Sequence, residues 1–169
     1  MEVTLQRAGR VDLSFQAPPS KSFTHRALIA AALAEGDSVI QNPLDAEDTR
    51  VTRTALIGMG VRVAAVDRLC PVAGTGGALS CPRGLVLDMQ NSGTSMRLLT
   101  SVALLCRSHV ILTGSARMKE RPLGPLAAAL TALGGSVSFL EKEGFPPLDV
   151  SGSLRGGTAR IDAGMSSQF

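Results

Sequence analysis

Small polar and cationic residues gather immediately before an apolar segment of helical length. The stretch reads PPSKSFTHR over residues 18–26, and an apolar run continues from Ala27 to Leu33. Backbone N–H groups at a helix start are free and the helix dipole is positive there, so this end attracts anions. Lys21 can add a point charge and Arg26 a planar fork of donors, which predicts binding of phosphate or carboxylate groups. Taken alone, a capped helix start with solvated basic side chains is the commoner origin of such a stretch.

A second stretch of the same kind favours a binding site. NSGTSMR covers residues 91–97 and again precedes an apolar segment. Aligned on Arg26 and Arg97, the two following segments read RALIAAALA and RLLTSVALL, and further on ALIGMG at 55–60 falls against ALTALG at 129–134. A repeat of this length indicates a duplicated supersecondary unit. Duplicates stacked about a common axis would bring their helix starts close together.

A third start of this type, GMSSQF, occupies residues 164–169, where the sequence ends. Ser166, Ser167 and Gln168 are again small polar groups ahead of an expected helix. We therefore expect a protein that is truncated at the start of its third repeat unit.

Hydrophobic periodicity and turn signals predict the elements that hold these stretches. Helices are expected near residues 22–34, 45–58, 98–105 and 122–133. Strands are expected at residues 3–5, 11–15, 38–41, 61–65, 69–73, 85–89, 109–113, 137–140, 148–151 and 158–162. The expected fold class is therefore α/β or α+β, with repeated β-α-β-α-β-β units.

The composition is typical of a soluble intracellular protein. No apolar run approaches the roughly 20 residues of a membrane span, and the alternating N-terminus is unlike a signal peptide. The net charge is +3, the basic residues are scattered, and five Phe without Tyr or Trp provide no stacking platform for nucleic acid. Cys70, Cys81 and Cys106 are odd in number and widely spaced, so we expect reduced thiols.

A loop in the second unit, LTGSARMKERP at residues 112–122, carries Arg117, Lys119 and Arg121. Binding residues concentrate in such connecting loops. A solvated loop with local charge pairing is an equally good explanation of the loop alone. Near two helix starts that attract anions, we expect the loop to form a second clamp for carboxylate or phosphate. His25, on the helix face away from Ser22, and His109, at the start of a strand, are both expected to be structural.

Four motifs in register resemble the 3-phosphoshikimate 1-carboxyvinyltransferase (EPSP synthase) family: APPSKSFTHRALIAAAL, NSGTSMR, LTGSARMKERP and GMSSQF. The resemblance covers essentially the whole chain, although Pro19 stands where Gly is common in the family, and family chains are more than twice as long. It implies a fold of two similar domains, each built from three β-α-β-α-β-β units as an inverse α/β barrel. Residues 1–16 would then be strands belonging partly to the other domain. Residues 17–169 would be most of one domain, with units at 17–90 and 91–162 and the start of a third at 163–169.

The resemblance implies transfer of the enolpyruvyl group of phosphoenolpyruvate to the 5-hydroxyl of shikimate 3-phosphate, in the shikimate pathway to chorismate and aromatic amino acids. It implies no cofactor and no metal. Residues carried over for shikimate 3-phosphate are Lys21, Ser22, Arg26, Ser166, Ser167 and Gln168. Residues carried over for phosphoenolpyruvate are Lys21, Asn91, Gly93, Arg117 and Gln168. The acid–base groups of the family have no counterpart in this sequence, so we expect the chain alone to be an inactive fragment with a substrate half-site.

Two alternatives stay open. A UDP-sugar enolpyruvyl transferase of the same fold would need a different first motif, without Ser20, Lys21 and Ser22 in this order. A non-catalytic anion- or RNA-binding module is conceivable because RNA 3′-phosphate cyclases contain the same repeat. The family reading predicts a cytoplasmic protein, monomeric at full length, with glyphosate as a candidate inhibitor and neither nucleic acid nor membrane as a partner.

Overall fold

A computed structural model describes residues 3–4, 9–10, 12–106, 108–162 and 164, and it contains two consecutive α/β units. The first unit consists of α1 (Lys21–Leu33), β1 (Asp37–Gln41), α2 (Glu47–Gly58) and β2 (Leu69–Ala73). The second consists of β3 (Leu85–Asp88), α3 (Gly93–Ala103), β4 (Val110–Thr113), the short 3₁₀ helix η1 (Met118–Glu120), α4 (Gly124–Ala132), β5 (Gly135–Phe139) and β6 (Leu148–Gly152). In chain order, α-β-α-β-β occurs twice, as α1-β1-α2-β2-β3 and as α3-β4-α4-β5-β6, which confirms the predicted α/β repeat. β3, which the sequence predicts as the end of the unit at 17–90, pairs with β4 and so joins the sheet of the second unit.

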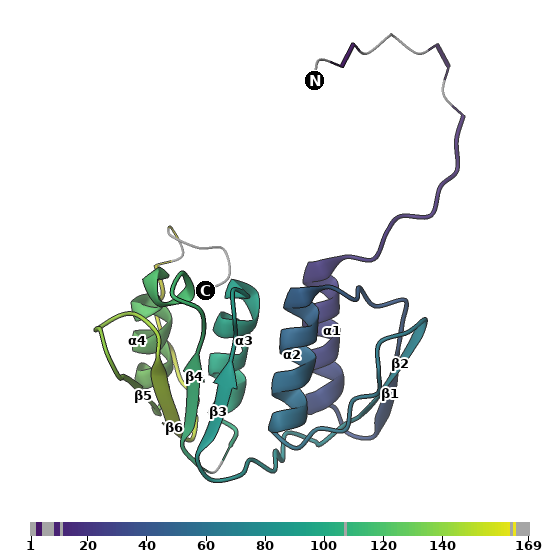
Figure 1. Ribbon diagram of the computed structural model, residues 1–169. Helices are drawn as coiled ribbons and strands as arrows, with labels where there is room; N and C mark the ends of the chain where they lie inside the picture. Colours follow the sequence, from purple (N-terminus) through teal and green to yellow (C-terminus); the bar gives the residue numbers. More distant parts are fainter. Residues whose placement is uncertain (1–2, 5–8, 11, 107, 163, 165–169) are drawn as a thin grey trace.

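α1, α2 and α3 lie side by side between the β1–β2 ribbon and the larger sheet, and α4 lies beside β5 (Figure 1). β1 and β2 pair antiparallel as a ribbon beside α1, with Val39 opposite Pro71. The other sheet has the order β3-β4-β6-β5, in which only the β3–β4 pair is parallel. α1, α2 and α3 all begin at the same end of the molecule (Figure 1), so their positive dipole ends point the same way.

A serine caps the start of each of the helices α1 and α3. The Ser20 hydroxyl accepts a hydrogen bond from the Phe23 N–H at 3.4 Å, and the Ser92 hydroxyl accepts one from the Ser95 N–H at 3.3 Å. A side-chain oxygen at this position satisfies one of the free N–H groups of the first turn. Both polar stretches therefore lie at helix starts, as expected. α3 begins at Gly93, however, five residues before the predicted start at 98, so residues 93–97 form its first turn.

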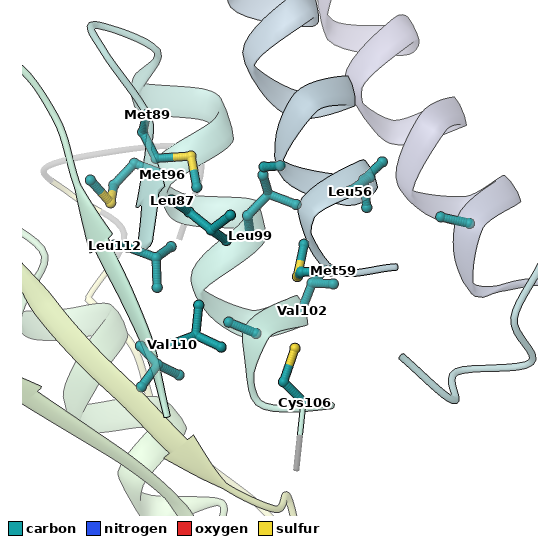
Figure 2. Packing of buried hydrophobic residues seen from close by; sticks show 14 of the residues in the cluster. Leu56, Met59, Leu87, Met89, Met96, Leu99, Val102, Cys106, Val110 and Leu112 are labelled. Carbon is teal, nitrogen blue, oxygen red and sulfur yellow. The ribbon is translucent and has the colours of Figure 1, made fainter. Parts of the chain in front are cut away.

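The core lies where α2 and α3 meet the four-stranded sheet. Figure 2 shows Leu99 and Met96 of α3 among side chains from neighbouring elements, all of them buried: Leu56, Met59, Leu87, Val110 and Leu112. Burial of such side chains, at about 25 cal/mol per Å² of apolar surface, is the main force that holds the two units together.

Two expected strands are absent from the described residues. Residues 61–65 form a single bridge, between Val63 and Val72, and residues 158–162 form no strand. A strand requires a neighbour for its backbone groups, and the part of the chain that the structure describes offers none to either segment beyond that bridge. Of the two N-terminal strands, residues 3–4 and 12–15 adopt no strand, and residues 5 and 11 lie outside the described residues.

The expectation of three reduced thiols is wrong. Cys81 and Cys106 form a disulfide with their Cα atoms 5.6 Å apart, and Cys70 is a buried free thiol. The disulfide joins the loop before β3 to the segment that follows α3. Packing of α3 against the sheet brings the two cysteines together, and their spacing of 25 residues in the sequence gives no sign of it.

Candidate anion-binding site

The start of α1 presents Lys21, Ser22 and Arg26 on its exposed face. The Lys21 ammonium lies 2.6 Å from the Asp48 carboxylate at the start of α2, and this pair joins the two helix starts. Arg26 donates from Nη1 to the Ser22 carbonyl oxygen at 3.0 Å, so its guanidinium lies back over the first turn. An anion that binds here therefore meets two cations. One is the Lys21 ammonium, which the Asp48 carboxylate orients, and the other is the Arg26 guanidinium, which lies near the free N–H groups of the helix start.

The start of α3 repeats the same contact. Arg97 donates from Nη1 to the Gly93 carbonyl oxygen at 3.2 Å, four residues back, as Arg26 does to Ser22. Side chains on a helix point toward its N-terminus, so a cation one turn into the helix covers the helix start. The alignment of the two units on Arg26 and Arg97 is thus matched by one hydrogen bond in each unit.

Two guanidinium groups meet beside Gly93. A Cβ atom on Gly93 would lie 2.5 Å from Nη1 of Arg121 and 2.9 Å from Nη1 of Arg97. Burial lowers the pKa of Arg97, and the charge of Arg121 lowers it further. These two guanidinium groups repel each other, and Gly93 leaves space beside them because it has no side chain. The arrangement is suited to binding a small anion with more than one oxygen.

The loop between β4 and α4 closes over this helix start. Ser115 donates from its backbone N–H to the Gln90 carbonyl oxygen at 3.0 Å, and its hydroxyl donates to the Asn91 side-chain oxygen. Met118 is buried and fixes η1 in the core. Arg121, which follows η1, is thereby brought to Gly93, whereas Arg117 at the beginning of η1 is exposed.

The sequence-predicted site residues therefore fall into three groups. The structure joins the start of α1 to α2 through Lys21 and Asp48, and it groups Asn91 and Gly93 with the loop that carries Arg121. Arg117 lies on that loop, with an exposed side chain. The remaining three lie outside the described residues: Ser166, Ser167 and Gln168.

The sequence motifs assign no ligand to Arg97 and include Arg121 only as one cation of the predicted clamp loop, although each residue leaves a signal in the sequence. Arg97 is four residues after Gly93, which is the spacing at which a helical side chain covers the helix start. Arg121 is one of three cations in the loop, and the sequence does not reveal which of the three faces Gly93.

Both histidines make contacts within the protein. His25 is fully buried, and its Nδ1 lies 2.7 Å from the Thr52 hydroxyl. Burial lowers its pKa, with Lys21 and Arg26 acting in the same direction against Asp48. His109, just before β4, pairs with Asp149 at 2.9 Å on the exposed side of the sheet.

Within the described ranges, no group of three or more His, Cys, Asp or Glu side chains is arranged to hold a metal ion. No helix among those residues is long and apolar enough to cross a membrane.

The repeated α/β units define an enolpyruvyl transferase fold. An EPSP synthase from Acinetobacter baumannii superimposes with a TM-score of 0.77 at 32% identity, over 83% of this chain and 32% of that chain. The enolpyruvyl transferase NikO from Streptomyces tendae, at 16% identity and a TM-score of 0.53 over 79% of this chain and 30% of its own, shares the fold alone.

The chain belongs to the EPSP synthase (3-phosphoshikimate 1-carboxyvinyltransferase) family, whose model matches residues 5–169. A 3-phosphoshikimate 1-carboxyvinyltransferase from Methanosphaerula palustris is 55% identical over the whole of this chain and 40% of its own length. One from Salmonella agona is 43% identical over 99% of this chain and 40% of its own length. The chain thus spans about 40% of the length of these curated relatives.

Proposed function

We propose that this protein serves the transfer of the enolpyruvyl group from phosphoenolpyruvate to the 5-hydroxyl of shikimate 3-phosphate. The methylene carbon of phosphoenolpyruvate gains a proton and becomes a methyl group, while the 5-hydroxyl oxygen bonds to carbon 2 as it loses its proton. The C–O bond to phosphate then breaks as the methyl group loses a proton, which restores the methylene double bond. The products are the enolpyruvyl ether EPSP and phosphate. The observation that carries the proposal is the pair of cationic helix starts, on α1 and α3, in a chain of this family.

Our proposed contacts follow the charges of the two substrates. Lys21, Ser22 and Arg26 hold shikimate 3-phosphate, together with Ser166, Ser167 and Gln168. Lys21, Asn91, Gly93, Arg117 and Gln168 hold phosphoenolpyruvate, and we add Arg121 because it lies beside Gly93. Fixed cations and helix N–H groups stabilise the charge that collects on the departing phosphate. We assign no acid–base step to the described residues.

For the full-length protein we propose a cytoplasmic, monomeric enzyme that binds no nucleic acid, requires no cofactor and is inhibited by glyphosate. The scattered basic residues and the absence of Tyr and Trp support the exclusion of nucleic acid.

Titration of this chain with shikimate 3-phosphate, followed by backbone amide NMR, tests the substrate. We expect saturable shifts at Ser22 and Arg26 at concentrations where plain shikimate and inorganic phosphate produce weaker ones. Equal shifts with inorganic phosphate would reduce the site to a general anion site. Unchanged spectra with shikimate 3-phosphate would contradict the proposal for this chain.

Lys21→Ala is expected to weaken the binding of both substrates, by about tenfold to a hundredfold in Kd. A hydrogen bond to a charged group contributes about 1.5–3 kcal/mol, and the change also leaves Asp48 as an uncompensated negative charge beside the site. Isothermal titration of each substrate measures the effect. Lys142→Ala is the matched control, because this lysine is not among the proposed ligands. Its ammonium lies 4.1 Å from the centre of the Phe145 ring instead. Equal effects of the two variants would contradict the assignment.

Arg121→Ala is expected to weaken phosphoenolpyruvate binding about tenfold or more while changing shikimate 3-phosphate binding little. Arg117→Ala, four residues away, is expected to have the smaller effect of the two, because its side chain is exposed at the start of η1. Titration of phosphoenolpyruvate into both variants ranks them. If Arg117→Ala leaves phosphoenolpyruvate binding unchanged, its place among the ligands is wrong. If Arg121→Ala does so, Gly93 and its guanidinium neighbours are not the phosphoenolpyruvate site.

Gly93→Ala is expected to leave stability nearly unchanged and to weaken phosphoenolpyruvate binding about tenfold. The added methyl group would lie 2.5 Å from Nη1 of Arg121, so this flexible side chain must move away from the helix start. Thermal unfolding and titration separate the two effects. Gly124→Ala is the matched control, since Gly124 is also the first residue of a helix and its Cβ would meet only Gly144 Cα, at 3.7 Å. A large loss of stability in Gly93→Ala would show that the guanidinium cannot give way.

A further inference from the structure

A continuous chain of hydrogen-bonded side chains crosses the interior between three helices. Nδ1 of His25 on α1 lies 2.7 Å from the Thr52 hydroxyl on α2, which lies 2.8 Å from the Ser95 hydroxyl on α3. The Ser95 hydroxyl lies 2.6 Å from that of Ser92. All four side chains are at most 1% exposed, so water does not compete for these bonds.

In this series of hydrogen bonds, each group has a preferred role as donor or acceptor. Nε2 of His25 is buried and has no hydrogen-bond partner among the described residues. An unpaired buried N–H is costlier than an unpaired lone pair, so the proton belongs on Nδ1, which then donates to Thr52. Thr52 in turn donates to Ser95. Ser95 donates either to Ser92 or to the backbone oxygen of Asp48 at 3.3 Å.

Both ends of this series of hydrogen bonds belong to helix turns that carry proposed ligand groups. His25 is next to Arg26 in the sequence and one turn after Lys21. Ser92 is the cap of α3 and stands directly before Gly93. Asp48, whose backbone accepts from Ser95, holds the Lys21 ammonium with its side chain. This series of hydrogen bonds therefore connects the start of α1 to the start of α3 through α2.

Apolar side chains could fill this space without needing hydrogen-bond partners. Buried polar groups cost free energy unless every one is bonded, and their bonds hold only at one relative position of the helices. A slide of α1 against α3 by about 1 Å would break at least one link, whereas packed methyl groups tolerate small slides more readily.

We propose that His25, Thr52 and Ser95 are positioning residues that set the spacing between the starts of α1 and α3. The ligand part of this inference rests on the proposed function. Phosphoenolpyruvate is the ligand whose proposed contacts span both starts, with Lys21 on α1 and Gly93 on α3. Shikimate 3-phosphate has its proposed contacts on α1 and none on α3 among the described residues, so its binding depends less on this spacing.

Thr52→Val in the full chain is the first test, because valine keeps the shape of threonine and removes the hydroxyl. We expect the Kd of phosphoenolpyruvate to rise about tenfold, since a misplacement of about 1 Å costs up to a hundredfold in related situations. The Kd of shikimate 3-phosphate should stay within about twofold, a split that a general loss of folding would not produce. Thr52→Ser should restore phosphoenolpyruvate binding. Thr54→Val, on the exposed side of α2, is the matched control.

A spectroscopic arm is independent of any substrate. In Thr52→Val, the ring ¹⁵N signals of His25 should change, and the amide signals of Lys21 and Gly93 should shift together. Thr54→Val should move neither. If Thr52→Val does not fold, Ser95→Ala breaks the next link with a smaller change in shape and should give the same pattern.

The outcomes separate the two proposals. Equal weakening of both substrates, or no change in phosphoenolpyruvate binding once the His25 signals have changed, would overturn the positioning role. If the unmodified chain binds neither substrate, the proposed function fails for this chain and the amide signals decide the inference. Joint shifts at Lys21 and Gly93 then support it, and a change confined to His25 overturns it.

Discussion

Leu99→Ala is expected to lower the free energy of unfolding by about 2–5 kcal/mol. Leu99 is fully buried in the middle of α3, between Leu56 of α2 and Leu87 of the sheet (Figure 2). Its removal leaves a cavity at the contact between the two units, and close-packed neighbours refill such a cavity only in part. Urea unfolding followed by far-UV circular dichroism measures the loss.

A second leucine provides the control for this change. Leu140 is 50% exposed, so Leu140→Ala should cost less than about 1 kcal/mol. A comparable loss in the two variants would mean that α3 is not the centre of the core. A drop in the urea slope of Leu99→Ala alone would indicate that the two units no longer unfold as one.

Reduction of the Cys81–Cys106 disulfide is expected to lower the free energy of unfolding by about 3.5 kcal/mol. The two cysteines are 25 residues apart, and opening a loop of that length restores entropy to the unfolded chain. Thermal unfolding with and without a phosphine reductant measures the shift in Tm. Thiol titration under denaturing conditions should find one thiol before reduction, from Cys70, and three afterwards.

The double variant Cys81→Ser with Cys106→Ser is the control for this experiment. It lacks the disulfide, so the reductant should leave its Tm unchanged. Its Tm should match that of the reduced protein to within a few degrees. A rise of the thiol count to three in the unmodified protein, with no change in Tm on reduction, would give the opposite answer. That result would show that packing alone holds the loop before β3 against the segment after α3.

The local features of this fold were predictable from the sequence. The starts of α1 and α3 depend on Ser20 and Ser92, whose side chains bond within one turn. Neighbouring residues in the sequence are therefore enough to predict them. The repeat alignment on Arg26 and Arg97 also survives in the structure, as one hydrogen bond in each unit. The burial of His25 followed from its place on the helix opposite the exposed cations.

Features that depend on distant partners were not predictable. Residues 61–65 have strand-forming composition, but a strand exists only where another backbone pairs with it. Cys81 and Cys106 meet because α3 folds back along the sheet. In the loop after β4, the turn at η1 decides that Arg121 reaches Gly93, and an irregular loop has no periodicity from which to read such a direction.

The two units differ in how firmly their sheets are held. The four-stranded sheet buries β4 and β6 between neighbours. β1 and β2 pair with each other, and among the described residues the single bridge from Val63 to Val72 is their one further backbone pairing. A two-stranded ribbon with so little additional pairing is barely stable in water. Its anchor is the segment after β2, where Gly74 donates to the Gly36 carbonyl oxygen and Thr75 to that of Ala32. We expect the native protein to open first at this ribbon, by local fluctuations that leave α3 and the larger sheet intact. Such opening uncovers the side of α1 that packs on β1 and β2, in the helix whose start carries Lys21 and Arg26.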